Sequence, residues 1–327
     1  MTPLPPLPFV DGAFLCDNSA LEHYQACRRF WELQDLRRYA VAANSAGRNF
    51  GSGVHAGLKV RYSEAGTRRP TPEQLIAIDE AITQHFATSP APVDDFRDAA
   101  HCKRMMAAYL DHYPLEPFRL LNVPGTDKAL VERPFALPLG TVYGHPIIWT
   151  GRLDLYIEDN SGRWSLDTKT AFQFGSGFED DMSTNGGQVG YCWAMQQLTG
   201  EKPTGYIINA IRVRRPSKAA KYANEGGGPA PIDASDFARI PHHVSQDAID
   251  EWREDVLALI EDIFDDHAKG RFPRSRKSCS GKYGRCDMFE VCTAPRAKRQ
   301  NILDSSLYVP NTWSPLNSTV PQTKTTN

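Results

Sequence analysis

Hydrophobic and polar positions alternate in two neighbouring segments near the middle of the chain, residues 152–157 and 164–169. A period of two residues is typical of strands that bury one face. Between the segments, the sequence DNSG at residues 159–162 consists of residues that favour turns. The pattern therefore predicts a β-hairpin, and the chemistry that we expect of this protein depends on it.

The hairpin brings three charged residues to one face. With two residues in the centre of the turn, Asp154 lies directly opposite Asp167 and Lys169 follows on the same face, whereas a three-residue turn would shift the register by about one position. Like charges directly across a sheet repel each other, so we expect a cation here, and carboxylate oxygens suit Mg²⁺ or Mn²⁺. Lys169 would orient a water or neutralise developing negative charge. This pattern alone also allows an exposed hairpin face with solvated charges.

Similar patterns predict the other elements. Further strands are expected at residues 129–137, 204–213 and 237–244, and helices at 19–39, 71–88, 94–113, 187–198 and 245–269. The sequences SALE at 19–22 and TPEQ at 71–74 have the form of helix starts. Residues 172–185 and 217–231 are rich in glycine and predict loops.

Two other residues are candidates for a site by their type. Glycines before His55 indicate that a helix starts close to it, where the backbone can approach another group, although a lone histidine is more often a surface or core residue than a ligand. Glu132 lies in the predicted strand at 129–137, and a solvated charge at a sheet edge is its simpler interpretation.

Composition adds few constraints. The chain has 327 residues, 41% of them hydrophobic and 23% charged, which is ordinary for a globular protein of one large or two modest domains. Because the net charge is −2, a polyanionic partner would have to meet a local basic patch. No apolar run is long enough to span a bilayer, and the N-terminus lacks the pattern of a signal peptide. We therefore expect a cytoplasmic protein with no membrane contact.

Three of the seven cysteines lie close together near the C-terminus, namely Cys279, Cys286 and Cys292. Three thiolates need a fourth ligand to complete a tetrahedral metal site or a cubane cluster, and Cys27, on a predicted helix with aromatic and basic residues, is the best candidate. A [4Fe–4S] cluster and Zn²⁺ both suit four thiolates, and either would tie the chain ends together. Three unrelated thiols in a basic loop are the other interpretation.

These motifs occur in the order of a known family. The series His55, the GRLD motif ending at Asp154, the DTK motif of Asp167 and Lys169, and Gln188 with Tyr191 resembles the PD-(D/E)XK nucleases of the RecB-like exonuclease class. The four cysteines resemble those of its iron–sulfur members, which include CRISPR-associated exonucleases, AddB-type helicase–nuclease subunits and phage-encoded nucleases. The resemblance covers residues 19–293. Two residues separate Gln188 from Tyr191 where the family usually has three, and Asp167 stands where many members carry Glu.

The resemblance implies a metal-dependent phosphodiesterase. Asp154 and Asp167 would hold one or two Mg²⁺ or Mn²⁺ ions with the carbonyl oxygen of Thr168, and His55 would be an additional ligand. Lys169 would position the attacking water or the phosphate. Two further catalytic candidates, Gln188 and Tyr191, would hold the DNA strand or brace the site. The cysteine cluster would be structural and would support a DNA-binding surface.

The implied fold is α/β, with a restriction-endonuclease-like mixed central sheet flanked by helices, a helical cap, and termini joined by the iron–sulfur cluster. The expected organisation is an irregular lead-in over residues 1–18, a single nuclease domain over 19–300 with a helical insertion at about 67–120, and a disordered tail over 301–327. Such an enzyme would act on single-stranded DNA or duplex ends in recombination, repair or phage DNA processing, as a homo-oligomer or with a recombination-protein partner.

Two rival interpretations remain at this point. One is a non-catalytic DNA-binding or scaffold subunit that keeps the nuclease fold, although a silent site has no need of the complete set of acidic residues and lysine. The other is a zinc-stabilised regulatory protein with an ordinary hairpin, which does not explain why the motifs follow the nuclease order. The sequence leaves open cleavage polarity, exonuclease against endonuclease action, and DNA against RNA.

Overall fold

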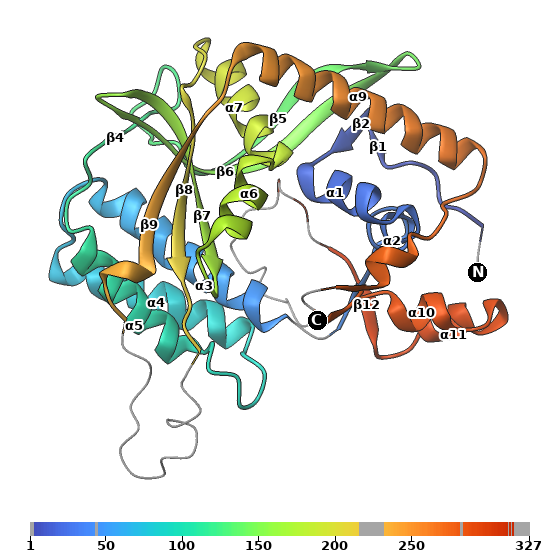
Figure 1. Cartoon of the computed structure of the whole chain (residues 1–327), viewed down its shortest axis with the longest axis horizontal. Coiled ribbons are helices and arrows are strands. Elements are labelled where there is room, and N and C mark those ends of the chain that lie inside the picture. Colours follow the sequence, from blue (N-terminus) through green and yellow to red (C-terminus); the bar gives the residue numbers. More distant parts are fainter. Residues whose placement is uncertain are drawn as a thin grey trace, which may run out of the picture. The chain divides into compact units, whose positions relative to one another are not determined.

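The computed structural model describes residues 3–42, 45–215, 232–281, 284–312, 314 and 316. Two compact units are each assembled from segments that are distant in sequence (Figure 1). The described residues of the first unit fall within Met1–Ala43, Pro134–Arg152 and Asp250–Thr319, and those of the second fall within Asn44–Arg133 and Leu153–Ile249. The predicted loop at 217–231 lies outside the described residues.

The second unit is built on a mixed sheet. The last part of β6 (His145–Asp159) pairs antiparallel with β7 (Gly162–Ala171), which runs parallel to β8 (Gly205–Arg212), and β9 (Phe237–His243) runs antiparallel to β8. The short strand β4 (Arg119–Leu120) pairs with the end of β6, and β5 (Val131–Val142) also pairs with β6. The predicted mixed sheet flanked by helices is therefore confirmed, and the three strand patterns beyond the hairpin fall on β5, β8 and β9.

The predicted hairpin register is also confirmed. Asp159 pairs with Gly162 and Leu155 with Leu166, so the turn has two central residues and the next positions along the strands are Asp154 and Asp167. The carboxylate of Asp159 holds the turn, since its Oδ1 accepts hydrogen bonds from the backbone N–H groups at 161 and 162 at 2.8 and 3.1 Å.

Gly162 is required at the end of this turn. Its φ of 138° lies in a region that L-residues rarely adopt, and a Cβ there would lie 2.0 Å from Oγ1 of Thr204. We expect Gly162→Ala to lower the free energy of unfolding by about 1–3 kcal/mol, measured by urea denaturation. Gly177→Ala is the matched control, because a Cβ at Gly177 meets no atom within 4 Å. Equal stability of the two variants would contradict this account.

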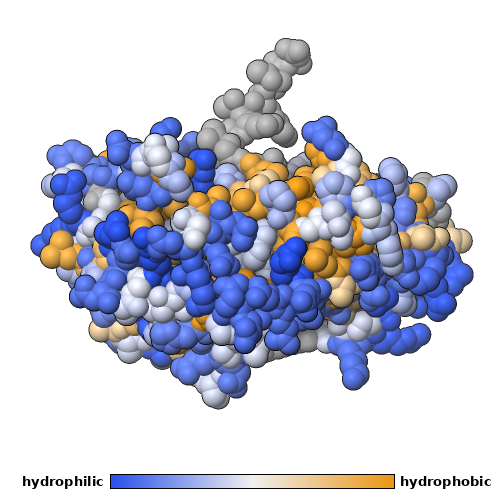
Figure 2. Space-filling view, turned by 90° about the horizontal axis from the view of Figure 1, so that it is seen from above, coloured by the Kyte–Doolittle hydropathy of each residue, from blue (hydrophilic) through white to orange (hydrophobic). Residues whose placement is uncertain are grey.

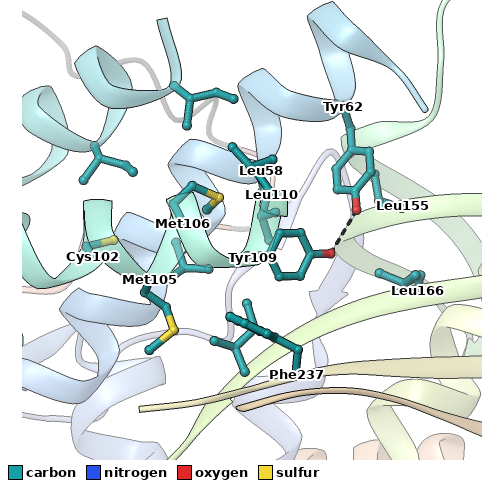
Figure 3. Packing of buried hydrophobic residues seen from close by; sticks show 14 of the residues in the cluster. Leu58, Tyr62, Cys102, Met105, Met106, Tyr109, Leu110, Leu155, Leu166 and Phe237 are labelled. Carbon is teal, nitrogen blue, oxygen red and sulfur yellow. Dashed lines mark hydrogen bonds between the residues drawn. The ribbon is translucent and has the colours of Figure 1, made fainter. Parts of the chain in front are cut away.

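Three helices cover one face of this sheet. They are α3 (Ala46–Val60), α4 (Pro72–Thr88) and α5 (Ala99–His112), and Figure 3 shows Met106 and Leu110 of α5 packed in one cluster with Leu155 and Leu166 of the strands. The predicted start of α4 is confirmed: Thr71 and Gln74 cap each other reciprocally. Helix α5 begins five residues later than the predicted position 94, because Asp98 caps it by accepting from the His101 N–H at 2.7 Å.

The expected helix start at His55 is wrong. Helix α3 begins at Ala46 and places His55 in its interior. The glycines serve close packing instead, because a Cβ at Gly53 would lie 2.7 Å from the ring of Phe86, and one at Gly57 would lie 2.9 Å from Cε of Met106. Glycine thus lets α3 approach α4 and α5 closely.

Two further helices of the second unit, α6 and α7, follow the hairpin in sequence. Helix α7 (Gly186–Thr199) is confirmed and packs against β7 and β8. Part of the predicted loop at 172–185 is instead helix α6 (Ser176–Ser183). The ring of Phe178 in α6 packs against that of Phe174 with centroids 5.6 Å apart, and this apolar contact favours the helical turn despite the glycines.

The first unit contains strands where an irregular lead-in was predicted. Strands β1 (Phe9–Val10) and β2 (Ala13–Cys16) form a hairpin, and β2 runs parallel to the start of β6. The reason is burial: the ring of Phe14 lies 5.1 Å from that of Phe264. Phe264 belongs to α9 (Gln246–Ala268), the predicted long helix, which is confirmed.

The predicted helix over 19–39 is interrupted. The structure has α1 (Asn18–Ala26), α2 (Arg28–Trp31), a π-helix (Glu32–Leu36) and β3 (Tyr39–Val41), and the N-cap is Asp17 rather than Ser19. Extended backbone at Cys27 separates α1 from α2. Its sulfur there accepts a hydrogen bond from the Ser275 N–H at 3.3 Å, a contact that sequence periodicity cannot reveal.

The predicted disorder from residue 301 is wrong for part of the tail. Helix α11 (Arg299–Leu303) and strand β12 (Tyr308–Pro310) are ordered, and β12 pairs antiparallel with β3. Leu303 and Tyr308 are buried in a small core with residues from both ends of the chain: Leu33, Met288, Val291 and Cys292. These apolar side chains hold the segment despite the polar composition around them.

The surface hydropathy agrees with the ordinary hydrophobic content of the sequence, 41% of the residues. Hydrophilic residues predominate on the face shown in Figure 2, with smaller hydrophobic areas among them. Among the described residues, no helix is both long enough and apolar enough to span a membrane.

Candidate metal-binding active site

Three metal-ligating side chains converge beside β7 in the second unit. His55 comes from α3, Glu132 from β5 and Asp154 from β6. Nδ1 of His55 lies 3.1 Å from Oε1 of Glu132 and 3.5 Å from Oδ2 of Asp154. One ligand atom from each of the three lies within 4.8 Å of the other two.

Glu132 is not a solvated edge charge, so its simpler interpretation from the sequence is wrong. Its side chain is 11% exposed and faces His55. Its backbone has a φ of 45°, which only a small fraction of residues other than glycine adopt. Such strain persists where the surrounding structure requires it, often at a functional site. No sequence pattern indicates this role of Glu132, because its backbone conformation and its partner both depend on the fold.

Thr168 links the strands of the hairpin to His55. Its backbone N–H donates to Oδ2 of Asp154 at 2.8 Å, and its carbonyl oxygen accepts from Nε2 of His55 at 3.1 Å. The Asp154 carboxylate and the Thr168 carbonyl are therefore both adjacent to the imidazole. Thr168 Oγ1 accepts from the amide of Asn209 at 3.1 Å, and that amide also donates to Tyr109 Oη at 3.1 Å.

Asn209 was not predicted as a site residue, because in the sequence it is a single polar position within the apolar strand β8. In the structure it is fully buried. We expect Asn209→Ala to weaken Mn²⁺ binding by about tenfold or more. The substitution removes the hydrogen bond that holds the side chain of Thr168, whose carbonyl oxygen lies in the candidate site. Isothermal titration of Mn²⁺ measures this. Tyr109→Phe is the control, because it removes the other partner of the amide and keeps the contact to Thr168. Equal affinities for wild type and Asn209→Ala would exclude this positioning role.

Asp167 and Lys169 form an ion pair on the next part of β7. Nζ of Lys169 lies 2.7 Å from Oδ2 of Asp167, whose side chain is 6% exposed, whereas that of Lys169 is 40% exposed. The buried carboxylate of Asp167 is thus held beside the group formed by His55, Glu132 and Asp154. The ammonium group of Lys169 reaches solvent.

Electrostatics at the site reflect crowded negative charge. Burial raises the pKa of Asp154 to about 7, against the effect of His55 and with added repulsion from Asp167 and Glu132. For His55, burial disfavours the charged form, but Asp154 and Glu132 outweigh it and raise the pKa to about 10. For Lys169, partial removal from water opposes the charged form, but Asp167 and Asp154 outweigh it and raise the pKa above its ordinary value. The crowded negative charge of Asp154, Asp167 and Glu132 therefore favours the binding of cations at this site.

The donor set fits a hard divalent ion. Carboxylate and carbonyl oxygens with one imidazole nitrogen are ligands that Mg²⁺ and Mn²⁺ accept, and thiolates, which would favour softer metals, are absent from this group of described residues.

The predicted pair on α7 lies on the helix that packs against β7 and β8. Gln188 is buried, and its Oε1 has no hydrogen-bond partner among the described residues. Tyr191 is close enough to Lys169 to contribute to its raised pKa, and the Tyr191 carbonyl accepts from Tyr156 Oη at 3.4 Å. The structure thus brings Tyr191 to the site, and it leaves a buried acceptor on Gln188 to be satisfied.

The four predicted cluster cysteines all belong to the first unit. The Cys286 N–H donates to the carbonyl oxygen of Cys279 at 3.0 Å. Burial raises the pKa of the Cys292 thiol to about 11, and Cys27 and Cys286 contribute to the rise. Burial also raises the pKa of Cys286, with contributions from Cys27 and Cys279. The sulfurs of Cys27 and Cys279 both contact the backbone of Ser275, whereas Cys16, Cys102 and Cys192 are buried outside this group.

The chain matches the profile of the PD-(D/E)XK nuclease superfamily over residues 18–293. None of the curated proteins matches it. Among solved structures, it is similar to a protein from Eubacterium rectale described as a putative exonuclease, with 13% identity, a TM-score of 0.43, and coverage of 85% of this chain and 88% of that chain.

A mixed sheet with an acidic hairpin, flanked by helices, together with a profile match over most of the chain, defines the class of protein. The chain belongs to the PD-(D/E)XK nuclease superfamily.

Proposed function

We propose that the protein is a divalent-metal-dependent deoxyribonuclease of the RecB-like class, an exonuclease that acts on DNA ends or single strands. The observation that carries this proposal is the convergence of His55, Asp154 and the Thr168 carbonyl beside the Asp167–Lys169 ion pair. Donors from a helix and two strands meet there, and the same face carries a lysine that reaches solvent.

Asp154 and Asp167 hold one or two Mg²⁺ or Mn²⁺ ions in this proposal, with the Thr168 carbonyl and His55 as further ligands. A bound ion would stabilise negative charge on the phosphate and lower the pKa of the attacking water. Lys169 donates to the scissile phosphate or the water, because its ammonium is charged at neutral pH and partly exposed. Gln188 and Tyr191 hold the nucleic-acid strand or brace the site.

Glu132 acts on the site through His55. Its Oε1 accepts a hydrogen bond from the Nδ1–H group of His55, so Nε2, which donates to the Thr168 carbonyl in this structure, would be the nitrogen that gives up its proton to bind a metal ion. Glu132 thus fixes the tautomer and the ring orientation. It also lies close enough to contribute an oxygen of its own.

We further propose that the four cysteines hold a [4Fe–4S] cluster, with Zn²⁺ as the alternative. Tetrahedral zinc needs thiolate sulfurs about 3.8 Å apart, from a Zn–S distance of about 2.3 Å. No three cysteine sulfurs among the described residues lie within 4.8 Å of one another. A cubane, in which each thiolate binds a different iron, accommodates sulfurs that lie farther apart than those around a zinc ion. The cluster is structural in this proposal and supports the small core of the first unit.

Anaerobic purification, followed by assays for iron, sulfide and zinc and by cleavage of end-labelled single- and double-stranded DNA with and without Mn²⁺, tests both parts. A brown protein whose cleavage is abolished by EDTA is the expected result. A colourless zinc protein that still cleaves would remove the iron–sulfur cluster and keep the nuclease. A protein with the cluster and no cleavage of any substrate would replace the enzyme by a DNA-binding subunit.

A further inference from the structure

Aromatic and basic side chains gather just beyond the end of β7, in the same unit as the candidate metal site. They come from the segment before α5, the segment after β7, helix α6 and the end of β8. We call them the basic–aromatic cluster: Phe96, Arg97, Phe172, Phe174, Phe178, Arg212 and Arg215.

Phe172 is at the centre of this cluster. The guanidinium carbon of Arg215 lies 4.6 Å from the centroid of its ring, and that of Arg97 lies 5.4 Å away. Phe96 is a ring neighbour, with centroids 6.5 Å apart. Phe172 is partly exposed. Its ring is therefore not part of the hydrophobic core with the guanidinium groups as a cover. Cation–π contact is its main interaction.

A second aromatic pair repeats the arrangement. The rings of Phe174 and Phe178 lie 5.6 Å apart, and the guanidinium carbon of Arg212 lies 6.0 Å from the ring of Phe174. Both rings are partly exposed. The chain therefore presents two neighbouring aromatic surfaces, each with an arginine beside it.

The arginines differ in how firmly they are held. Two carboxylate oxygens of Asp95 accept from Arg97 at 2.8 and 2.7 Å, and Asp236 accepts from Arg212 at 2.6 Å. Arg215 is exposed. Two of the guanidinium groups are thus fixed in place, and the third can leave the ring of Phe172 without giving up a buried position.

The cluster is close to the proposed site of cleavage. Phe172 follows Lys169 by three residues, which is a path of roughly 10 Å along an extended chain. A stacked strand rises about 3.4 Å per nucleotide, so this distance corresponds to about three nucleotides. A strand whose phosphate lies at Lys169 can therefore reach Phe172 with a nearby base.

We propose that the basic–aromatic cluster binds unpaired nucleotides of a single-stranded nucleic acid. A base stacks on the ring of Phe172 in place of Arg215, and the displaced guanidinium binds a phosphate of the same strand. Partly exposed rings with basic neighbours are suited to this ligand because every base has a face that can stack, whereas the bases of a duplex are stacked on each other. This inference rests on the proposed function only in that the bound strand continues into the metal site.

Fluorescence anisotropy in EDTA tests the surface without any cleavage. The probes are a fluorescein-labelled oligothymidylate, the corresponding oligouridylate and a blunt hairpin duplex. We expect Phe172→Ala to weaken oligothymidylate binding by about 5- to 150-fold, the range for losing one stacked base, and to leave duplex binding unchanged. Phe172→Tyr retains the ring and should bind like wild type, and Phe172→Leu, which keeps an apolar side chain without an aromatic face, should fail as Phe172→Ala does.

Arg215→Gln gives an independent readout. We expect the slope of log affinity for oligothymidylate against log salt to become shallower by about 0.7, the value for one phosphate contact on a single strand. A folding defect would not change this slope by a defined amount. A similar loss with oligouridylate would support stacking of bases from either DNA or RNA, and a loss with oligothymidylate alone would support a surface selective for thymidylate, through its deoxyribose or its base methyl group.

Binding of oligothymidylate by Phe172→Ala within about twofold of wild type, or equal losses for single strand and duplex, would overturn the proposal. These outcomes are separate from those for the proposed function. Cleavage with Mn²⁺ that does not depend on Phe172 would leave the nuclease and remove this surface. Binding that depends on Phe172 in a protein that cuts no substrate would leave the surface and remove the nuclease.

Discussion

Asp167→Asn is expected to reduce Mn²⁺-dependent DNA cleavage by about a thousandfold, the largest effect on activity that we expect from any single change. Asparagine retains the shape of the side chain and removes the charge that would hold the metal beside Asp154. Metal-assisted stabilisation of the phosphate is worth several kcal/mol, and each 1.36 kcal/mol is about tenfold in rate. Cleavage of end-labelled DNA under saturating Mn²⁺ measures the change.

Two controls make this result specific. Asp111→Asn, at an exposed position of α5, changes the net charge equally and should cleave like wild type. The folded fraction of Asp167→Asn should be checked by thermal unfolding, because the substitution also removes the partner of Lys169. A folded Asp167→Asn protein that cleaves at the wild-type rate would refute the proposed metal site.

Cys27→Ser is expected to abolish the iron–sulfur chromophore and to give the largest loss of stability. Metal binding by four thiolates contributes on the order of 10 kcal/mol to the folding of small metal-binding domains, which is comparable with the whole stability of a typical protein. The small core at Leu33, Met288 and Val291 should therefore loosen when the cluster is lost. Iron and sulfide content, absorption near 400 nm and urea unfolding measure these changes.

Cys16→Ser is the matched control for this substitution. Cys16 is a buried cysteine of the same unit that lies outside the four, and its sulfur donates to the Ile148 carbonyl at 3.6 Å, which a serine hydroxyl can also do. We expect this variant to retain its full iron content. Unchanged iron in Cys27→Ser would exclude Cys27 as a ligand, and zinc in place of iron in the wild type would leave the stability prediction intact and change the metal.

Local signals allowed much of the second unit to be predicted. The period-two alternation and the turn residues predicted the β6–β7 hairpin and its register, because side-chain direction and turn length depend on neighbouring residues alone. The capping box of α4 and the amphipathic pattern of α9 were equally local. The acidic residues on one face of the hairpin followed from the same register.

Signals that depend on distant contacts were missed or misread. His55 was predicted near a helix start because glycines precede it, whereas the packing of α4 and α5 requires these glycines inside α3. Cys27 interrupts a periodic segment because its sulfur meets the backbone at Ser275. The tail past residue 301 has a polar composition, yet Tyr308 is buried and β12 completes a two-stranded sheet with β3.

The sequence by itself determined which side chains of one hairpin share a face, and its motif order indicated the nuclease family. Only the tertiary structure decided that Glu132 faces His55, that Asn209 holds Thr168, and that Phe172 lies against two arginines. The physical reason is the range of each interaction. Alternation and turn chemistry act within a few residues, whereas these contacts join residues that lie between 41 positions apart, as for Thr168 and Asn209, and 77 positions apart, as for His55 and Glu132. They exist only once helices and strands have packed.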